Sequence, residues 1–231
     1  MLRHDERIET AGSGNFLPRP FKILFLISAL ALFLCASANA GAAVPDAAAR
    51  IQAAYRQIRD ASGRFEQKSY LKDLGKTETF GGDFMLKLPS KMRYIYKTGS
   101  NDQVIIKGNM IMIYQKKENQ IMKGRFDAGT YGTAPVAFLG GLGDIERDFR
   151  VTEKKGDLIL RPKDPMSGIT YIEVEPTKGP SSFPVKSFII HDRYSNTVRI
   201  TLRDVKLNRG MKDSAFEFTP PPGTSVFDYT H

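Results

Sequence analysis

Hydrophobic and polar residues alternate along most of this chain, but one early segment follows a helical period instead. Apolar residues recur there at the spacing 0, 3, 4 and 7, which places them on one face of a helix: Ile51, Ala54, Tyr55 and Ile58. Pro45-Asp46 predicts the start of this helix, because proline is favoured in the first helical turn. Ser62-Gly63 predicts its end.

After this helix the pattern is typical of β-strands. Short runs rich in aromatic, Thr and β-branched residues are separated by turn residues such as Lys107-Gly108-Asn109. Their close spacing predicts one antiparallel meander or barrel in a single domain. The predicted strands are Arg64–Leu71, Lys76–Lys87, Lys91–Lys97, Gln103–Ile106, Met110–Gln115, Gln120–Phe126, Phe149–Glu153, Asp157–Arg161, Ile169–Glu175, Val185–His191 and Thr197–Leu207.

Alternation divides these strands into two faces. Between Met110 and Tyr114 both faces are apolar. A sheet that packs on one helix needs an apolar face simply to fold, so such residues form either a filled core or the lining of a hollow, where Met adapts to irregular apolar ligands. Composition alone does not distinguish a filled core from a hollow one. The apolar residues that share a face are Phe84, Leu86 and Leu88 in one strand and Met92, Tyr94 and Tyr96 in the next.

The segment 127–148 interrupts the strand pattern. Five glycines surround the apolar run Thr133–Leu139. Proline early in a helix and glycine after its last apolar residue predict one or two short helices on flexible joints. The segment is either a surface crossover or a lid over a cavity, since long loops inside compact domains often have a function.

The first forty residues have the pattern of a secretory signal peptide. Ile23–Ala36 contains no charge, Arg19 and Lys22 precede it, and Ala38-Asn39-Ala40 provides a small-x-small cleavage site. The apolar run is shorter than the roughly 18–20 residues that a membrane-spanning helix needs. We therefore expect export and cleavage after Ala40, which leaves residues 41–231 as one mature domain.

Cleavage changes the chemistry of the mature chain. The single cysteine, Cys35, leaves with the signal, so no disulfide, thiolate metal site or cysteine nucleophile is expected. The whole chain has a net charge of +9, and four basic and three acidic residues before Gly41 account for +1, which leaves +8. Export and the spread of the basic residues argue against nucleic-acid binding. Anionic lipid or an acidic protein surface fits this charge better.

No catalytic motif is found. His191 and His231 are the only histidines after the signal, and they lack metal-ligand spacing. The chain contains no G-x-S-x-G, P-loop or G-x-G-x-x-G motif. We therefore expect no enzyme activity, no cofactor and no metal.

Three stretches of the chain, met in order, carry longer motifs. Gly82–Tyr96, GDFMLKLPSKMRYIY, has the pattern G-x-F-x-L-x-x-P-x-K-x-R-aromatic-x-Y. Ile105–Tyr114, IIKGNMIMIY, is an apolar strand, a turn glycine and a strand that ends in Tyr, and Asp213–Val226, DSAFEFTPPPGTSV, contains F-x-F-x-x-P-x-G-x-x-V. Together these stretches resemble the LolA family of periplasmic outer-membrane lipoprotein carriers, and Phe65-Glu66-Gln67 adds a weaker match.

The resemblance implies an incomplete antiparallel β-barrel, closed by an N-terminal helix and a short helical lid, with an apolar cavity for the acyl chains of lipoproteins. Lys87, Lys91 and Arg93 are candidates for electrostatic contact with a partner. Matched onto this chain, the cavity residues are Phe84, Leu86, Met92, Tyr94 and Tyr96, and the lid residues are Pro135, Val136, Phe138 and Leu139.

The implied partners are a triacylated lipoprotein cargo, an inner-membrane lipoprotein-releasing ABC transporter, and an outer-membrane acceptor or the outer membrane surface. The implied state is a periplasmic monomer. Well-known members carry Arg immediately before the proline matched by Pro89, where it helps to hold the lid shut, whereas this chain has Leu88. A sensor or regulator on the same fold, which binds lipid or lipoprotein in the periplasm, is the alternative.

Overall fold

A computed structural model of the chain describes residues 45–126, 145–163, 168–179 and 182–229. These residues belong to one compact unit, Ala42–His231. The predicted signal peptide and the predicted lid residues Pro135, Val136, Phe138 and Leu139 lie outside the described residues.

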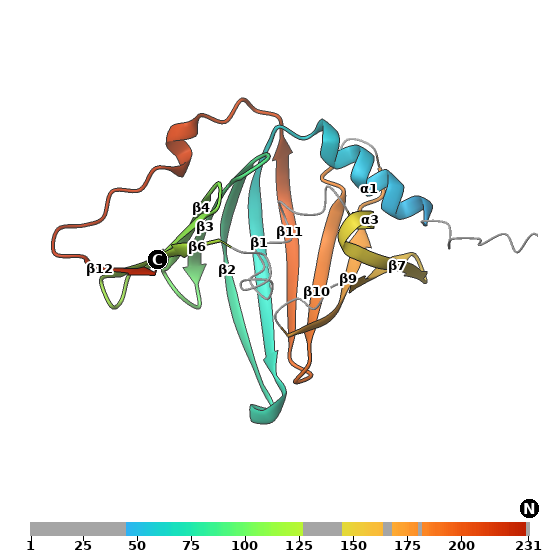
Figure 1. The fold of residues 1–231 in the computed structure, drawn as a ribbon, viewed down its shortest axis with the longest axis horizontal. Coiled ribbons are helices and arrows are strands. Elements are labelled where there is room, and N and C mark those ends of the chain that lie inside the picture. The colour runs from blue at the N-terminus through green and yellow to red at the C-terminus, as the bar shows by residue number, and fades with distance from the viewer. Residues whose placement is uncertain (1–44, 127–144, 164–167, 180–181, 230–231) are drawn as a thin grey trace, which may run out of the picture. The chain divides into compact units, whose positions relative to one another are not determined.

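The described chain is mainly β and forms one twelve-stranded sheet, in agreement with the predicted antiparallel meander (Figure 1). Its order is β12-β6-β5-β4-β3-β2-β1-β11-β10-β9-β8-β7, so the sheet is open and not closed into a barrel. Every neighbouring pair is antiparallel except β12 and β6, which are parallel. The strands are β1 (Asp60–Leu71), β2 (Lys76–Lys87), β3 (Lys91–Thr98), β4 (Gln103–Lys107), β5 (Met110–Gln115), β6 (Gln120–Arg125), β7 (Phe149–Lys154), β8 (Asp157–Pro162), β9 (Ile169–Pro176), β10 (Val185–Asp192), β11 (Thr197–Leu207) and β12 (Ser225–Tyr229).

Helix α1 (Asp46–Gln57) begins where Pro45-Asp46 predicted and packs its apolar stripe against one face of the sheet. We call this the inner face and the opposite one the outer face. The remaining described helices are short: η1 (Lys72–Leu74), α3 (Ile145–Asp148) and η3 (Asp213–Phe216). Within the described ranges, none of the helices is both long and apolar enough to cross a membrane.

The predicted end of the first helix is wrong. Helix α1 stops at Gln57, Ile58 is already extended, and Ser62-Gly63 lies inside β1. Strand β1 pairs with β2 from Asp60 onward and with β11 from Ala61 onward. Ser62 and Gly63 therefore lie within the paired part of the sheet and not in a helix end. Glycine at position 63 allows its neighbours to pack closely, because a Cβ atom there would lie 2.9 Å from both the Phe84 ring and the carbonyl oxygen of Arg203.

The predicted division of the strands into faces is confirmed by burial. Phe84 and Leu86 on β2 and Met92 and Tyr94 on β3 are buried in the main hydrophobic core, and Leu88 packs against it. The intervening positions on both strands are half-buried or exposed. The inner face therefore carries the core, and helix α1 covers part of it.

Candidate functional site

The structure brings the five predicted cavity residues together on the inner face of β2 and β3. Phe84 pairs with Tyr94 across the two strands, and Leu86 pairs with Met92. Tyr96 lies opposite Gly82, one step further along, and is half-buried. All five belong to, or pack against, one continuous hydrophobic cluster. Whether this cluster opens into a cavity stays a prediction.

A chain of aromatic rings links these residues to helix α1. The sequence pattern does not assign Phe65 and Phe183 to the site, because neither belongs to a strand with strict apolar alternation. Their positions become apparent only from the ring contacts. The ring centroids are 5.0 Å apart in Phe65–Tyr94, 5.2 Å in Phe65–Tyr96, 6.2 Å in Phe84–Tyr94, 6.5 Å in Phe84–Phe183 and 5.4 Å in Tyr55–Phe183.

The apolar row that starts at Phe84 continues to the edge of the sheet and becomes more exposed on the way. The register runs from Tyr94 through Val104, Ile113 and Met122 to Phe227 on β12. Tyr94 is 1% exposed, the three middle residues are half-buried, and Phe227 is 45% exposed. The apolar surface of the core therefore extends along this row to the edge of the sheet.

The tyrosine hydroxyls of this site differ in their partners. The Tyr96 hydroxyl donates to Oε1 of Gln67 at 3.2 Å, whereas those of Tyr55 and Tyr94 have no hydrogen-bond partner within the described structure. Burial, with Asp102 as a further cause, raises the pKa of Tyr96 to about 12. Burial also raises the pKa of Tyr55, and burial with the neighbouring Tyr96 and Tyr55 raises that of Tyr94 well above its usual value. All three phenols are therefore neutral near pH 7.

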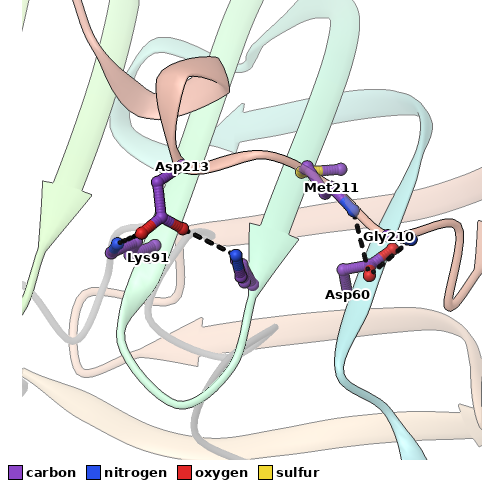
Figure 2. Close-up of polar contacts among 6 residues, drawn as sticks. Asp60, Lys91, Gly210, Met211 and Asp213 are labelled. Carbon is purple, nitrogen blue, oxygen red and sulfur yellow. Dashed lines mark hydrogen bonds and ion pairs between the residues drawn. The ribbon is translucent and has the colours of Figure 1, made fainter.

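The three predicted partner-contact residues lie on the outer face, where they bind a segment of the same chain. We call residues 208–218, which follow β11, the strap. The ammonium nitrogens of Lys87 and Lys91 lie 2.6 and 2.7 Å from the two carboxylate oxygens of Asp213 (Figure 2). Arg93 donates to the carbonyl oxygens of Ala215 at 2.9 Å and Glu217 at 3.1 Å. Contact of these cations with a separate partner stays a prediction.

Apolar contacts also hold the strap. Helix η3 lies against β3 and β4, and Phe216 within it is 1% exposed. The ring of Phe218 lies 4.9 Å from that of Tyr114, and the Arg93 guanidinium lies 6.0 Å from its centroid. This contact explains why both faces of Met110–Tyr114 are apolar: one faces the core and the other faces the strap.

The buried carboxylate of Asp60, at the start of β1, binds the first residues of the strap. Asp60, 4% exposed, accepts backbone N–H groups from Arg209, Gly210 and Met211 at 2.8, 3.1 and 3.2 Å. Figure 2 shows the bonds from Gly210 and Met211. The Asn208 N–H donates to the carbonyl oxygen of Asp60 at 2.8 Å. The first turn of the strap is thus fixed to the start of β1.

The ion pairs of Asp213 predict a change in the strap at acidic pH. Hydrogen bonds from Lys87 and Lys91 lower the pKa of Asp213 from 3.8 to about 2. The pKa of this carboxyl is lower in the folded protein than in the unfolded chain. Its ion pairs therefore stabilise the strap fully above about pH 4, and this stabilisation is lost as the pH falls toward 2. Carbon-13 NMR titration of the Asp213 carboxyl should show the low pKa. In Lys91→Gln it should rise toward 3.8. An unchanged pKa in that variant would contradict the pairing.

The described residues provide no metal centre: no group of three or more His, Cys, Asp or Glu side chains among them could hold an ion. The inner face carries hydrocarbon side chains and phenols that are neutral near pH 7.

Comparison with known proteins finds one matching family and several similar chains. Residues 56–219 match the family described as outer membrane lipoprotein carrier protein LolA. The chain is 26% identical to an outer-membrane lipoprotein carrier protein of Cupriavidus pinatubonensis, over 87% of this chain and 96% of that protein. It is 26% identical to one from Halorhodospira halophila, over 75% and 82% of the two chains. A crystal structure of a LolA superfamily protein from Nitrosomonas europaea is similar with a TM-score of 0.46 and 12% identity, and the match covers 74% of this chain and 97% of that one. The family match spans most of the chain, and the protein belongs to the LolA family of outer membrane lipoprotein carriers.

Proposed function

We propose that this protein is a periplasmic carrier that binds the acyl chains of triacylated lipoproteins on the inner face of its sheet. It receives cargo from an inner-membrane lipoprotein-releasing ABC transporter and delivers it, as a monomer, to an outer-membrane acceptor or to the membrane itself. The observation that carries the proposal is the apolar row from Tyr94 to Phe227, which is buried at one end and 45% exposed at the other. Membership of a carrier family supports it.

The energy of binding requires a mechanism of release. At about 0.8 kcal/mol per buried CH₂, a few acyl chains of about sixteen carbons could contribute roughly 30 kcal/mol. Non-covalent affinities level off near about 20 kcal/mol, and a carrier that tight would not unload. We propose that apolar side chains occupy the site in the empty state and are displaced on loading, which offsets part of this gain. The proposed lid residues Pro135, Val136, Phe138 and Leu139 are the candidates for this role.

The function is tested by purifying residues 41–231 from the periplasm and identifying bound molecules by mass spectrometry. Recovery of lipoprotein supports the carrier. Recovery of phospholipid without lipoprotein favours the alternative of a lipid- or lipoprotein-binding sensor. Recovery of neither contradicts both.

A matched pair of variants on β5 tests the face that binds. Ile113 lies on the inner face and Met112 on the outer face, and both are half-buried. A carboxylate placed in the path of hydrocarbon must be desolvated, so Ile113→Glu is expected to reduce bound lipoprotein by about tenfold or more. Met112→Glu should leave binding near the wild-type level. Equal loss in the two variants would exclude the inner face as the binding surface.

A further inference from the structure

In the part of the chain that the structure describes, two buried hydroxyl groups, one on helix α1 and one on the inner face, have no hydrogen-bond partner. The side chain of Tyr55, on α1, and that of Tyr94, on β3, are 2% and 1% exposed. Within the described residues no protein atom accepts a hydrogen bond from either hydroxyl. Buried polar groups in folded proteins are almost always paired, and each exception calls for an explanation.

The surroundings of these hydroxyls are apolar. The rings of Phe183 and Phe84 connect Tyr55 to Tyr94, and Phe65 lies on the other side of Tyr94. Tyr96, in the same cluster, is different because Gln67 accepts its hydrogen bond. Phenylalanine at positions 55 and 94 would give the same packing without burying an unpaired donor, so packing alone does not account for the two hydroxyls.

We propose that Tyr55 and Tyr94 are hydrogen-bond donors for the ester carbonyl oxygens at the glycerol end of the bound acyl chains. This inference rests on the proposed function, and it identifies the chemical group that the site recognises. A neutral phenol in an apolar site suits a neutral acceptor, and the ester carbonyl is the polar group that diacylglycerol chains carry into such a site. Ester recognition would set the depth to which the chains enter, which apolar contacts alone do not fix.

The test compares ester-linked and ether-linked probes on the purified mature protein. The first pair is a synthetic triacylated lipopeptide with two ester-linked palmitoyl chains and its counterpart with ether-linked chains. A diester and a diether phosphatidylglycerol form the second pair, which separates lipoprotein from phospholipid as the source of the ester. Two hydrogen bonds of ordinary strength predict about tenfold tighter binding of the diester over the diether.

Removal of only the hydroxyls should abolish this preference. In Tyr55→Phe/Tyr94→Phe we expect diester and diether lipopeptides to bind equally, because only the diester has lost hydrogen bonds. The double variant should melt at or above the wild-type temperature, because it removes unpaired buried donors. The matched control, Tyr96→Phe, loses the bond to Gln67 and should melt lower while it keeps the ester preference.

The possible results separate the two proposals. Equal binding of diester and diether by the wild type, or an ester preference that persists in the double variant, overturns the ester inference and leaves the carrier function standing. The first of these results is also expected if trapped water satisfies the hydroxyls. Failure of the wild type to bind either lipopeptide overturns the carrier function and this inference with it.

Discussion

Gly82→Ala is expected to lower the free energy of unfolding by about 3 kcal/mol, because the new methyl group would collide with backbone and not with a movable side chain. A Cβ atom at position 82 would lie 2.0 Å from the carbonyl oxygen of Ile95 and 3.0 Å from Cα of Tyr96. Both atoms belong to β3, the hydrogen-bonded neighbour of β2, and the register shifts at Gly81/Gly82. Relief of the collision requires the two strands to separate locally.

Gly81→Ala is the matched control for this prediction. There the nearest atom is the hydroxyl oxygen of Thr98, at 2.9 Å, and that side chain can rotate away. Urea denaturation followed by circular dichroism should show a loss of about 1 kcal/mol or less for Gly81→Ala. Similar losses for the two variants would show that the collision at Gly82 is relieved more easily than the backbone geometry indicates.

The position of Gly82 also matters for the inner face. It lies between Phe65 on β1 and Tyr96 on β3, and the rings of these two residues approach to 5.2 Å in edge-to-face geometry. A glycine between two aromatic residues on neighbouring strands leaves room for the rings to meet across the middle strand. The glycine that opens the family motif is therefore part of the aromatic cluster that the proposed cargo would contact.

The predicted bounds of β2, β5 and β11 agree with the structure at both ends, and the division into faces was predicted correctly for β2 and β3. Buried and half-buried positions alternate over 83–87 on β2 and 91–95 on β3, so the period-two pattern defines the face of each residue there. The helix end at Ser62-Gly63 was predicted wrongly because glycine supports two different structures. It can end a helix, or it can allow close packing inside a strand, and only the nearby Phe84 ring decides between them.

The contacts of the outer face could not be read from local pattern. Alternation places Lys87, Lys91 and Arg93 on that face, but their partners lie more than 120 positions later in the chain.

Strand β12 was not predicted for a related reason. Its five residues are all exposed, so no alternation marks it, and its parallel pairing with β6 joins segments about 100 residues apart. The unpaired hydroxyls of Tyr55 and Tyr94 likewise become apparent only from the packing.

Asp60→Ala is expected to release the first turn of the strap and to lower the free energy of unfolding by about 3 kcal/mol. The buried carboxylate accepts three backbone N–H groups, and its removal leaves three donors without their acceptor. Asn208 keeps its own contacts in this variant, because its N–H donates to the backbone carbonyl oxygen of Asp60 and its side-chain amide donates to that of Gln57.

Asp213→Ala removes the same charge from the same strap and serves as the control for Asp60→Ala. Its carboxylate is exposed and bound only to lysine side chains, so we expect a much smaller loss of stability. Hydrogen exchange followed by mass spectrometry should separate the two variants. In Asp60→Ala, amides 209–211 should exchange at least about tenfold faster, since they lose the acceptor that protects them. In Asp213→Ala these amides should stay protected, because the carboxylate of Asp60 still holds them. If exchange at 209–211 is unchanged in Asp60→Ala, the apolar contacts of Phe216 and Phe218 hold the strap by themselves, and the buried carboxylate is not its anchor.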